Sequence, residues 1–221
     1  MALPHLTREE YLPLALILVT IFLSVVGQPH FPETLPVEWR AFGLVTKVIR
    51  TDVAMYLMPG FILAVYLWLL RLGHRDPLRK NILACWDAVY WLRASTVIFL
   101  LGLYIFVLGA GFGAWAPTVN AALTIGFSYV FYMYGRQLPR LKRNYSFGII
   151  TPWTLESNQT WRLTHLRAGQ YFLVAAILNL SALFFTAWSF WVALLLLVIV
   201  LGAARLYAWQ AYHKESPHGA I

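Results

Sequence analysis

Residues 190–207 read FWVALLLLVIVLGAARLY, an apolar run whose single charge, Arg205, lies near its end. A helix needs about 20 mostly apolar residues to cross the hydrocarbon layer of a membrane. Five other stretches have the same character. The chain is therefore predicted to be all-α, a polytopic membrane protein with six transmembrane helices. The predicted spans are residues 11–27, 52–72, 94–112, 115–135, 168–187 and 190–207.

The composition favours the same class of protein. Of 221 residues, 60% are hydrophobic and 12% are charged, whereas about 25% of a soluble domain is charged. The first span lacks a small-x-small cleavage pattern, so it is predicted to be a retained helix rather than a signal peptide. Cys85 is the single cysteine, which excludes an intrachain disulfide and gives no spacing for a metal site. Neither a metal nor a cofactor is expected.

The positive charges are distributed unevenly among the loops between these spans. Fourteen of the 17 Lys and Arg residues lie on one side of the predicted membrane, and the other side has only Arg40, Lys47 and Arg50. Because loops rich in Lys and Arg stay in the cytoplasm, both termini are predicted to be cytoplasmic. The same bias explains the net charge of +8 without a nucleic-acid partner.

Two connecting segments are too long to be simple turns, and they organise the chain into two regions. Residues 1–93 form a two-helix region with a proline-rich external loop. Pro29, Pro32 and Pro36 favour an extended path in that loop, which is predicted to lie at the membrane interface as a re-entrant segment. Residues 94–221 form a four-helix region that contains a cytoplasmic segment, the motif loop, at residues 136–167.

The motif loop opens with a basic cluster. Its members are Arg136, Arg140, Lys142 and Arg143. Basic residues beside a membrane span attract anionic lipids by about 1 kcal/mol each. These four side chains are therefore predicted to bind lipid headgroups.

The rest of the loop predicts a defined local structure. Gly148 follows an Asn-Tyr-Ser-Phe sequence and can adopt a positive φ, which indicates a specific turn. Pro152 is typical of the start of a helix, and either Thr154 or Ser157 can cap a short helix over residues 157–164. That helix would bring Trp161 and His165 onto one face, one turn apart.

The sequence N-Y-x-F-G-I-x-T-P-W-T-L at residues 144–155, followed by W-x-x-T-H-x-x-x-G at residues 161–169, resembles the SdpI family. These are bacterial membrane proteins named for immunity to a secreted killing peptide. The stretch of residues 35–39 also resembles the amino-terminal domain of that family. The resemblance marks the following residues for binding a ligand or a partner: Asn144, Tyr145, Phe147, Gly148, Thr151, Pro152, Trp153, Thr154, Trp161, Thr164 and His165.

The resemblance implies a multi-pass protein of the bacterial inner membrane that acts as an immunity or sensor protein. Its expected partners are membrane lipid, an antimicrobial peptide outside and a soluble repressor inside; the oligomeric state stays open. Two positions depart from the family pattern. Ile150 stands where members usually carry Arg, and Glu38 stands where they often carry His, so a particular ligand specificity does not transfer.

Three other functions compete with this one. A transporter or lipid-handling protein would have ionisable residues inside the spans, and the predicted spans contain almost none. An accessory subunit of a larger membrane complex would suit the glycine-rich stretch of residues 102–113, because glycines allow close helix packing. An enzyme could use His165 with Ser157 and Glu156, but no catalytic sequence motif is present. The chain is therefore predicted not to be an enzyme.

Overall fold

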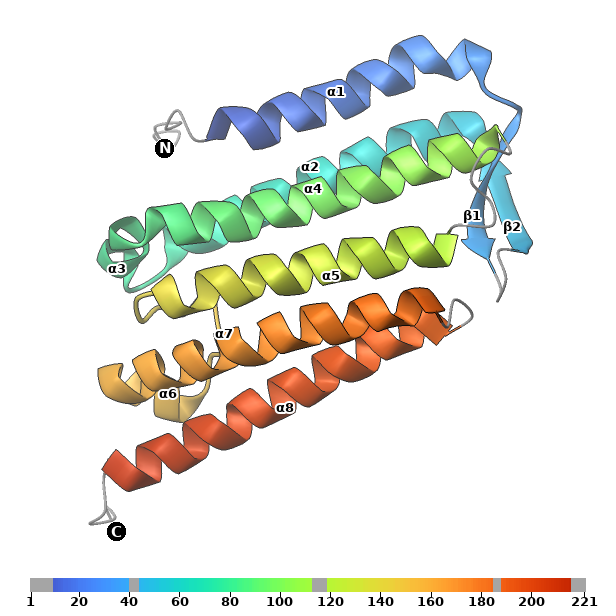
Figure 1. Ribbon diagram of the computed structural model, residues 1–221. Helices are drawn as coiled ribbons and strands as arrows, with labels where there is room; N and C mark the ends of the chain where they lie inside the picture. The colour runs from blue at the N-terminus through green and yellow to red at the C-terminus, as the bar shows by residue number, and fades with distance from the viewer. Residues whose placement is uncertain (1–9, 40–43, 113–118, 185–187, 216–221) are drawn as a thin grey trace.

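A computed structural model describes residues 10–39, 44–112, 119–184 and 188–215. Long helices dominate these residues and lie side by side with successive helices running in opposite directions (Figure 1). They are α1 (Tyr11–Gly27), α2 (Thr51–Arg75), α4 (Trp86–Gly111), α5 (Val119–Gln137), α7 (Asn158–Leu180) and α8 (Ser189–Glu215). The predicted all-α class is thus confirmed.

The two ends of the bundle differ. One end, called the loop end, holds α3 (Arg79–Ala84), the 3-10 helix η5 (Leu138–Arg140) and α6 (Pro152–Glu156), and α1 begins and α8 ends there (Figure 1). The opposite end, called the hairpin end, holds η2 (Gln28–His30), η6 (Ser181–Phe184) and the strands β1 (Thr34–Trp39) and β2 (Val45–Arg50). The motif loop therefore lies at the same end as the first residues of α1 and the last residues of α8.

Five helical stretches among the described residues are long and apolar enough to cross a membrane: residues 11–30, 51–75, 86–111, 158–184 and 190–215. The helix α5 has 19 residues and packs between α4 and α7. It is not among the five, because Asn120, Ser128 and several tyrosines make it more polar. A sixth crossing at α5 stays a prediction.

The predicted spans 94–112 and 168–187 began too late. Helix α4 begins at Trp86 and α7 at Asn158, since the first turns of both helices carry polar side chains that lower the local hydropathy. The short helix expected over residues 157–164 is the beginning of α7 and not a separate element. The expected tight turn around Gly113 and Pro117 lies outside the described residues.

The proline-rich segment forms a two-stranded antiparallel sheet, β1 with β2, rather than an irregular loop, and its place at the membrane interface stays a prediction. Pro36 lies at an irregularity in the pairing, where its missing N–H does not break a regular ladder. Leu35 is fully buried against residues of α1, α2 and α4. This side chain anchors the hairpin to the ends of the helices.

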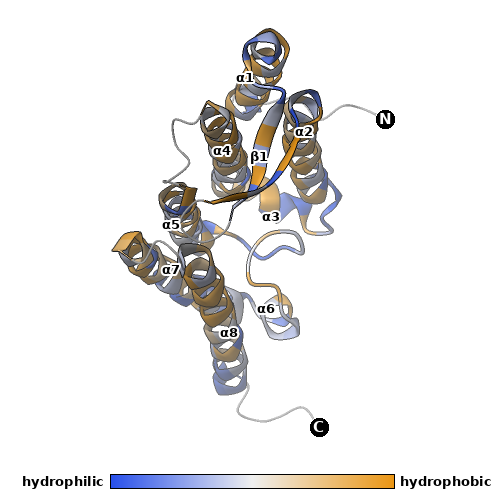
Figure 2. Cartoon of the chain, turned by 90° about the vertical axis from the view of Figure 1, so that its right-hand side faces the viewer, coloured by the Kyte–Doolittle hydropathy of each residue, from blue (hydrophilic) through white to orange (hydrophobic). Residues whose placement is uncertain are grey.

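Two groups of buried side chains hold the helices together. One joins α1, α2, β1 and the middle of α4, and the other joins the start of α4 to α5, α7, α8 and the motif loop. Viewed from the hairpin end, α1, α2 and α4 lie on one side and α7 and α8 on the other, with α5 between them (Figure 2). Asn179 on α7 ties α7 to α5 by donating to Thr124 O and Ser128 Oγ, both at 2.9 Å.

Candidate functional site

The first half of the motif loop is organised around Asn144, which is fully buried. Its Oδ1 accepts hydrogen bonds from the N–H groups of Ser146 at 2.9 Å and Phe147 at 2.6 Å, and its Nδ2 donates to Lys142 O at 2.8 Å. An Asn side chain that bonds backbone groups two and three residues on fixes a tight turn. Asn144 is therefore a structural residue of the turn.

Asp76, at the end of α2, fastens this turn to the other side of the bundle. Its Oδ2 accepts from Tyr145 N at 2.8 Å and Ser146 Oγ at 2.6 Å, and its Oδ1 accepts from Leu78 N at 2.7 Å. Asn81 of α3 also donates to Arg143 O at 2.8 Å. Nothing in the sequence pattern indicated these partners, because they lie more than 60 residues from the loop.

Gly148 and His165 meet at the centre of the loop. Gly148 has φ of 119°, the left-handed region that glycine adopts without strain, which confirms the predicted turn. A Cβ at this position would collide with the imidazole of His165. The sequence therefore needs glycine here for its conformation and for the close approach of the histidine ring.

Both nitrogens of His165 are occupied by backbone groups. Its Nε2 accepts from Ile149 N at 2.9 Å, and its Nδ1 lies 2.8 Å from Trp161 O. Because Nε2 accepts, the proton must be on Nδ1, which donates to that carbonyl. His165 is 1% exposed, so the ring holds the loop against α7 and has no lone pair left to act as a base.

Trp161 stacks on His165 as the i, i+4 spacing predicted. The ring centroids are 4.0 Å apart and the planes are inclined by 20°. The indole Nε1 donates to Leu141 O at 2.9 Å, and Trp161 is 2% exposed. The motif loop packs against this pair of rings.

Two threonines cap the first turn of helix α6 reciprocally. Thr151 Oγ1 accepts from Thr154 N at 3.2 Å, while Thr154 Oγ1 accepts from Thr151 N at 2.9 Å. Thr154 Oγ1 also lies 2.9 Å from Ile149 O, to which it donates. Ser157 is the N-cap of α7 and accepts from Gln159 N and Thr160 N at 3.1 Å. The prediction is confirmed for Ser157, whereas Thr154 is the third residue of α6, and the N-cap of that helix is Thr151.

The far end of α8 also contacts the loop. Glu215 accepts hydrogen bonds from Ser157 Oγ at 2.6 Å and Thr160 Oγ1 at 2.9 Å. The Arg205 guanidinium lies over the Trp153 ring at 5.7 Å from its centroid. Ser157 is thus committed to capping and to Glu215, and the serine, glutamate and histidine considered for catalysis do not form one site.

The marked residues separate into two groups by exposure. Tyr145, Gly148 and Pro152 are exposed and Trp153 is half-buried. The others point inward: Asn144, Phe147, Thr151, Thr154, Trp161, Thr164 and His165 are buried. Most of the motif therefore builds the loop, and partner binding by its exposed members stays a prediction.

Two members of the predicted lipid-binding cluster are engaged within the protein. Arg143 donates to Leu155 O at 2.9 Å and Glu156 O at 3.0 Å, the carbonyls at the end of α6, where a cation also offsets the helix dipole. Arg140 forms an ion pair with Asp87. Arg136 and Lys142 are exposed, and lipid binding by the cluster stays a prediction.

A buried charged cluster inside the bundle was missed from the sequence. Arg93 of α4 forms an ion pair with Glu10 at the start of α1, and both are at most 1% exposed. The Tyr66 hydroxyl of α2 donates to Glu10 Oε2 at 2.5 Å. Arg93 had been counted as a loop residue because the span was started at Ala94. Ionisable residues at such positions are functional candidates.

The cluster is next to the motif loop. A Cβ on Gly73 of α2 would lie 4.0 Å from Arg93 Nη1 and 3.5 Å from the Phe147 ring. The Arg93 guanidinium also lies over the Trp86 ring at 4.5 Å from its centroid. Arg93 and Phe147 therefore both lie beside Gly73.

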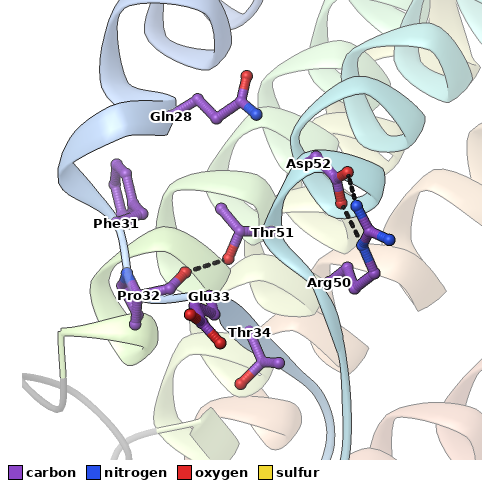
Figure 3. Close-up of a pocket in the computed structure, with 8 residues that line it drawn as sticks. All are labelled: Gln28, Phe31, Pro32, Glu33, Thr34, Arg50, Thr51 and Asp52. Atoms are coloured by element: carbon purple, nitrogen blue, oxygen red, sulfur yellow. Dashed lines mark hydrogen bonds and ion pairs between the residues drawn. The ribbon is translucent and has the colours of Figure 1, made fainter.

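A recess lies at the hairpin end and has a volume of about 440 Å³. Figure 3 shows its lining, in which Arg50 pairs with Asp52 at 2.5 Å and Thr51 Oγ1 donates to Pro32 O. The lining residues are Gln28, Phe31, Pro32, Glu33, Thr34, Arg50, Thr51 and Asp52. The recess combines two carboxylates, one guanidinium and an aromatic ring, so it suits a polar or amphiphilic ligand.

Comparison with known proteins shows what this chain is similar to. Residues 140–208 match the model of the SdpI/YfhL protein family. The matched part contains the whole motif from Asn144 to Gly169 and α8 as far as Ala208. The resemblance that the motif predicted is confirmed.

The similarity to known proteins extends beyond residues 140–208. The chain is 22% identical over 208 residues to "Immunity protein SdpI" of Bacillus subtilis (strain 168), and the match covers 93% of this chain and 95% of that relative. A match of this length includes the β1–β2 hairpin and Arg93. No solved structure matches this chain.

Proposed function

We propose that this chain is an SdpI-type immunity protein of the bacterial inner membrane, which protects the cell from a secreted antimicrobial peptide or senses it. The observation that carries the proposal is similarity along 93% of the chain to a protein named for immunity. The complete motif supports it, because its buried residues build one specific loop rather than a general membrane anchor.

The proposed orientation puts the loop end in the cytoplasm. Arg71, Arg75, Arg79, Lys80 and Arg136 are at or near this end, whereas Lys47 and Arg50 are the described basic residues at the hairpin end. Such an imbalance favours a cytoplasmic loop end. The hairpin end would then face outward, where a secreted peptide arrives.

The recess at the hairpin end is the proposed point of contact for the peptide. Glu33 is exposed, and among the described residues it forms no ion pair. A carboxylate beside the half-buried Phe31 ring matches a cationic amphiphilic peptide, whose ammonium and apolar side chains need both kinds of group.

On the cytoplasmic side, the exposed Tyr145, Ile150 and Pro152 form the proposed contact surface for a soluble repressor. Tyr145 and Ile150 are 50% and 39% exposed. Apolar and aromatic side chains of this kind are typical of the centres of protein interfaces. Since Ile150 replaces the usual Arg of the family, this surface would select a partner without a carboxylate at that position.

Expression of the chain in a Bacillus subtilis strain that lacks its own SdpI tests the proposal. Growth in the presence of the killing peptide should be restored relative to an empty vector. A variant with Glu33→Gln should protect less at equal membrane abundance. Unchanged sensitivity with normal insertion would count against an immunity role for that peptide.

A coupled transporter is the second candidate, and the buried Glu10–Arg93 pair is the observation that favours it. Charged residues inside a bundle are a common feature of proton relays. Proton flux into vesicles that contain the purified chain, measured with a pH-sensitive dye, distinguishes the two functions. A flux abolished by Glu10→Gln in protein that still purifies folded would support transport, and the absence of flux in the unchanged chain would count against it.

A further inference from the structure

An apolar cavity of about 450 Å³ lies between the two sides of the bundle. Its walls are side chains of α2, α4, α5, α7 and α8, including Trp68, Phe131 and Leu201, and residues 146–149 of the motif loop form its end. The volume is within the range of about 300–1,000 Å³ that is typical of small-ligand sites. Most of the lining is apolar, so the cavity suits a hydrocarbon group.

The cavity opens toward the side of the bundle, between α2 and α8. The two rim residues on these helices are exposed: Trp68 by 59% and Leu201 by 44%. If these helices cross a bilayer, as their length and hydropathy indicate, the opening faces lipid.

Arginines stand beside this opening, one turn nearer the loop end. Arg71 follows Trp68 by three residues on α2, and Arg205 follows Leu201 by four on α8, so each arginine shares a face with a rim residue. Both are exposed. The Arg205 guanidinium is held over Trp153 of α6, which keeps it on the side of α8 that faces the motif loop.

From this geometry we propose that the cavity binds an acyl chain of an anionic phospholipid, with the phosphate held by Arg205 and Arg71. The apolar walls match the acyl chain, and the arginines match the charge of the headgroup at the depth where headgroups begin. Ser146 to Ile149 line the end of the cavity, so a bound lipid would contact the motif loop directly.

The location favours lipid over a secreted peptide as the occupant. The cavity lies in the loop-end half of the bundle and opens sideways, whereas a peptide from outside would meet the hairpin end first. The proposal does not depend on an immunity function, because lipid binding is measured on the purified chain alone.

Native mass spectrometry of the full chain in detergent tests the proposal. Phosphatidylglycerol and phosphatidylcholine with identical acyl chains are titrated in parallel. Phosphatidylglycerol should bind more tightly, and Arg205→Gln should weaken its binding by about fivefold, the equivalent of about 1 kcal/mol for one basic residue. Arg162→Gln, an exposed arginine on α7 that does not line the cavity, is the matched control and should have no effect.

A second variant tests the cavity itself. Leu201→Trp fills it and should reduce the binding of both lipids, whereas Leu195→Trp, at a residue of α8 that is 60% exposed and does not line the cavity, should not. Equal binding of the two lipids, or unchanged binding in Leu201→Trp, would overturn the proposal. A co-purified peptide in place of phospholipid would also overturn it. If Leu201→Trp fails to purify as a monodisperse protein, Arg205→Gln decides.

Discussion

The backbone N–H of Ile149 donates to Nε2 of His165 across 2.9 Å, and this bond joins the motif loop to α7. The opposite ring nitrogen donates to Trp161 O on the same helix. Because both nitrogens form hydrogen bonds with backbone groups, the histidine side chain holds the loop in a fixed position against α7. Its place in the motif follows from the shape of the loop and needs no catalytic role.

Gly148→Ala should destabilise the folded protein. A methyl group would meet the His165 ring, and the left-handed φ is strained for alanine, which together correspond to about 1–3 kcal/mol. Thermal unfolding of the purified chain in detergent measures the loss.

Gly202→Ala is the matched control for that measurement. An added Cβ at Gly202 meets no atom within 4 Å, and the residue lies in the middle of α8. The control should be neutral or slightly stabilising, since alanine favours helix. Equal melting temperatures for the two variants would contradict the role assigned to Gly148.

Glu10→Gln should be strongly destabilising, because it removes the carboxylate from a buried arginine. Removing one partner of a buried ion pair typically lowers the free energy of unfolding by about 3–5 kcal/mol. The double variant Glu10→Gln with Arg93→Gln should lose less than the sum of the two single losses, as expected for groups in direct contact. Unfolding of the four proteins forms a double-mutant cycle.

The exposed pair Arg50–Asp52 is the control for the buried pair. Their side chains are 77% and 38% exposed, so Asp52→Asn should leave the melting temperature nearly unchanged. Additive losses in the Glu10–Arg93 cycle would mean that the interaction between Glu10 and Arg93 contributes no stability.

The local parts of this architecture could be predicted from sequence, and the long-range parts could not. The Trp161–His165 stack follows from helical spacing, and the turn at Gly148 follows from the conformational freedom of glycine. The bonds from Tyr145 and Ser146 to Asp76 depend on how α2 packs beside the loop, which no local pattern encodes. The Glu10–Arg93 pair was hidden because polar residues in the first turns of α4 masked the true start of the helix.

Cys85 should react slowly with a maleimide at neutral pH while the protein is folded. Burial raises the pKa of its thiol, and Sγ donates to Asn81 O at 3.1 Å and accepts from Lys142 N at 3.4 Å. The thiolate is the reactive form, so labelling should accelerate as the pH rises toward that raised pKa. Denatured chain is the control and should be labelled quickly, whereas equal rates would show that the site is open.

The orientation of the bundle is testable by labelling in intact cells. In a Cys85→Ser background, Tyr145→Cys reports on the loop end and Val48→Cys on the hairpin end, and both positions are 50% exposed. A membrane-impermeant maleimide should label Val48→Cys alone, because the positive charges favour a cytoplasmic loop end. Both variants should be labelled after the cells are lysed, which controls for access at each site. Labelling of Tyr145→Cys in intact cells would reverse the topology, and the hairpin recess could then no longer be the first contact of a secreted peptide.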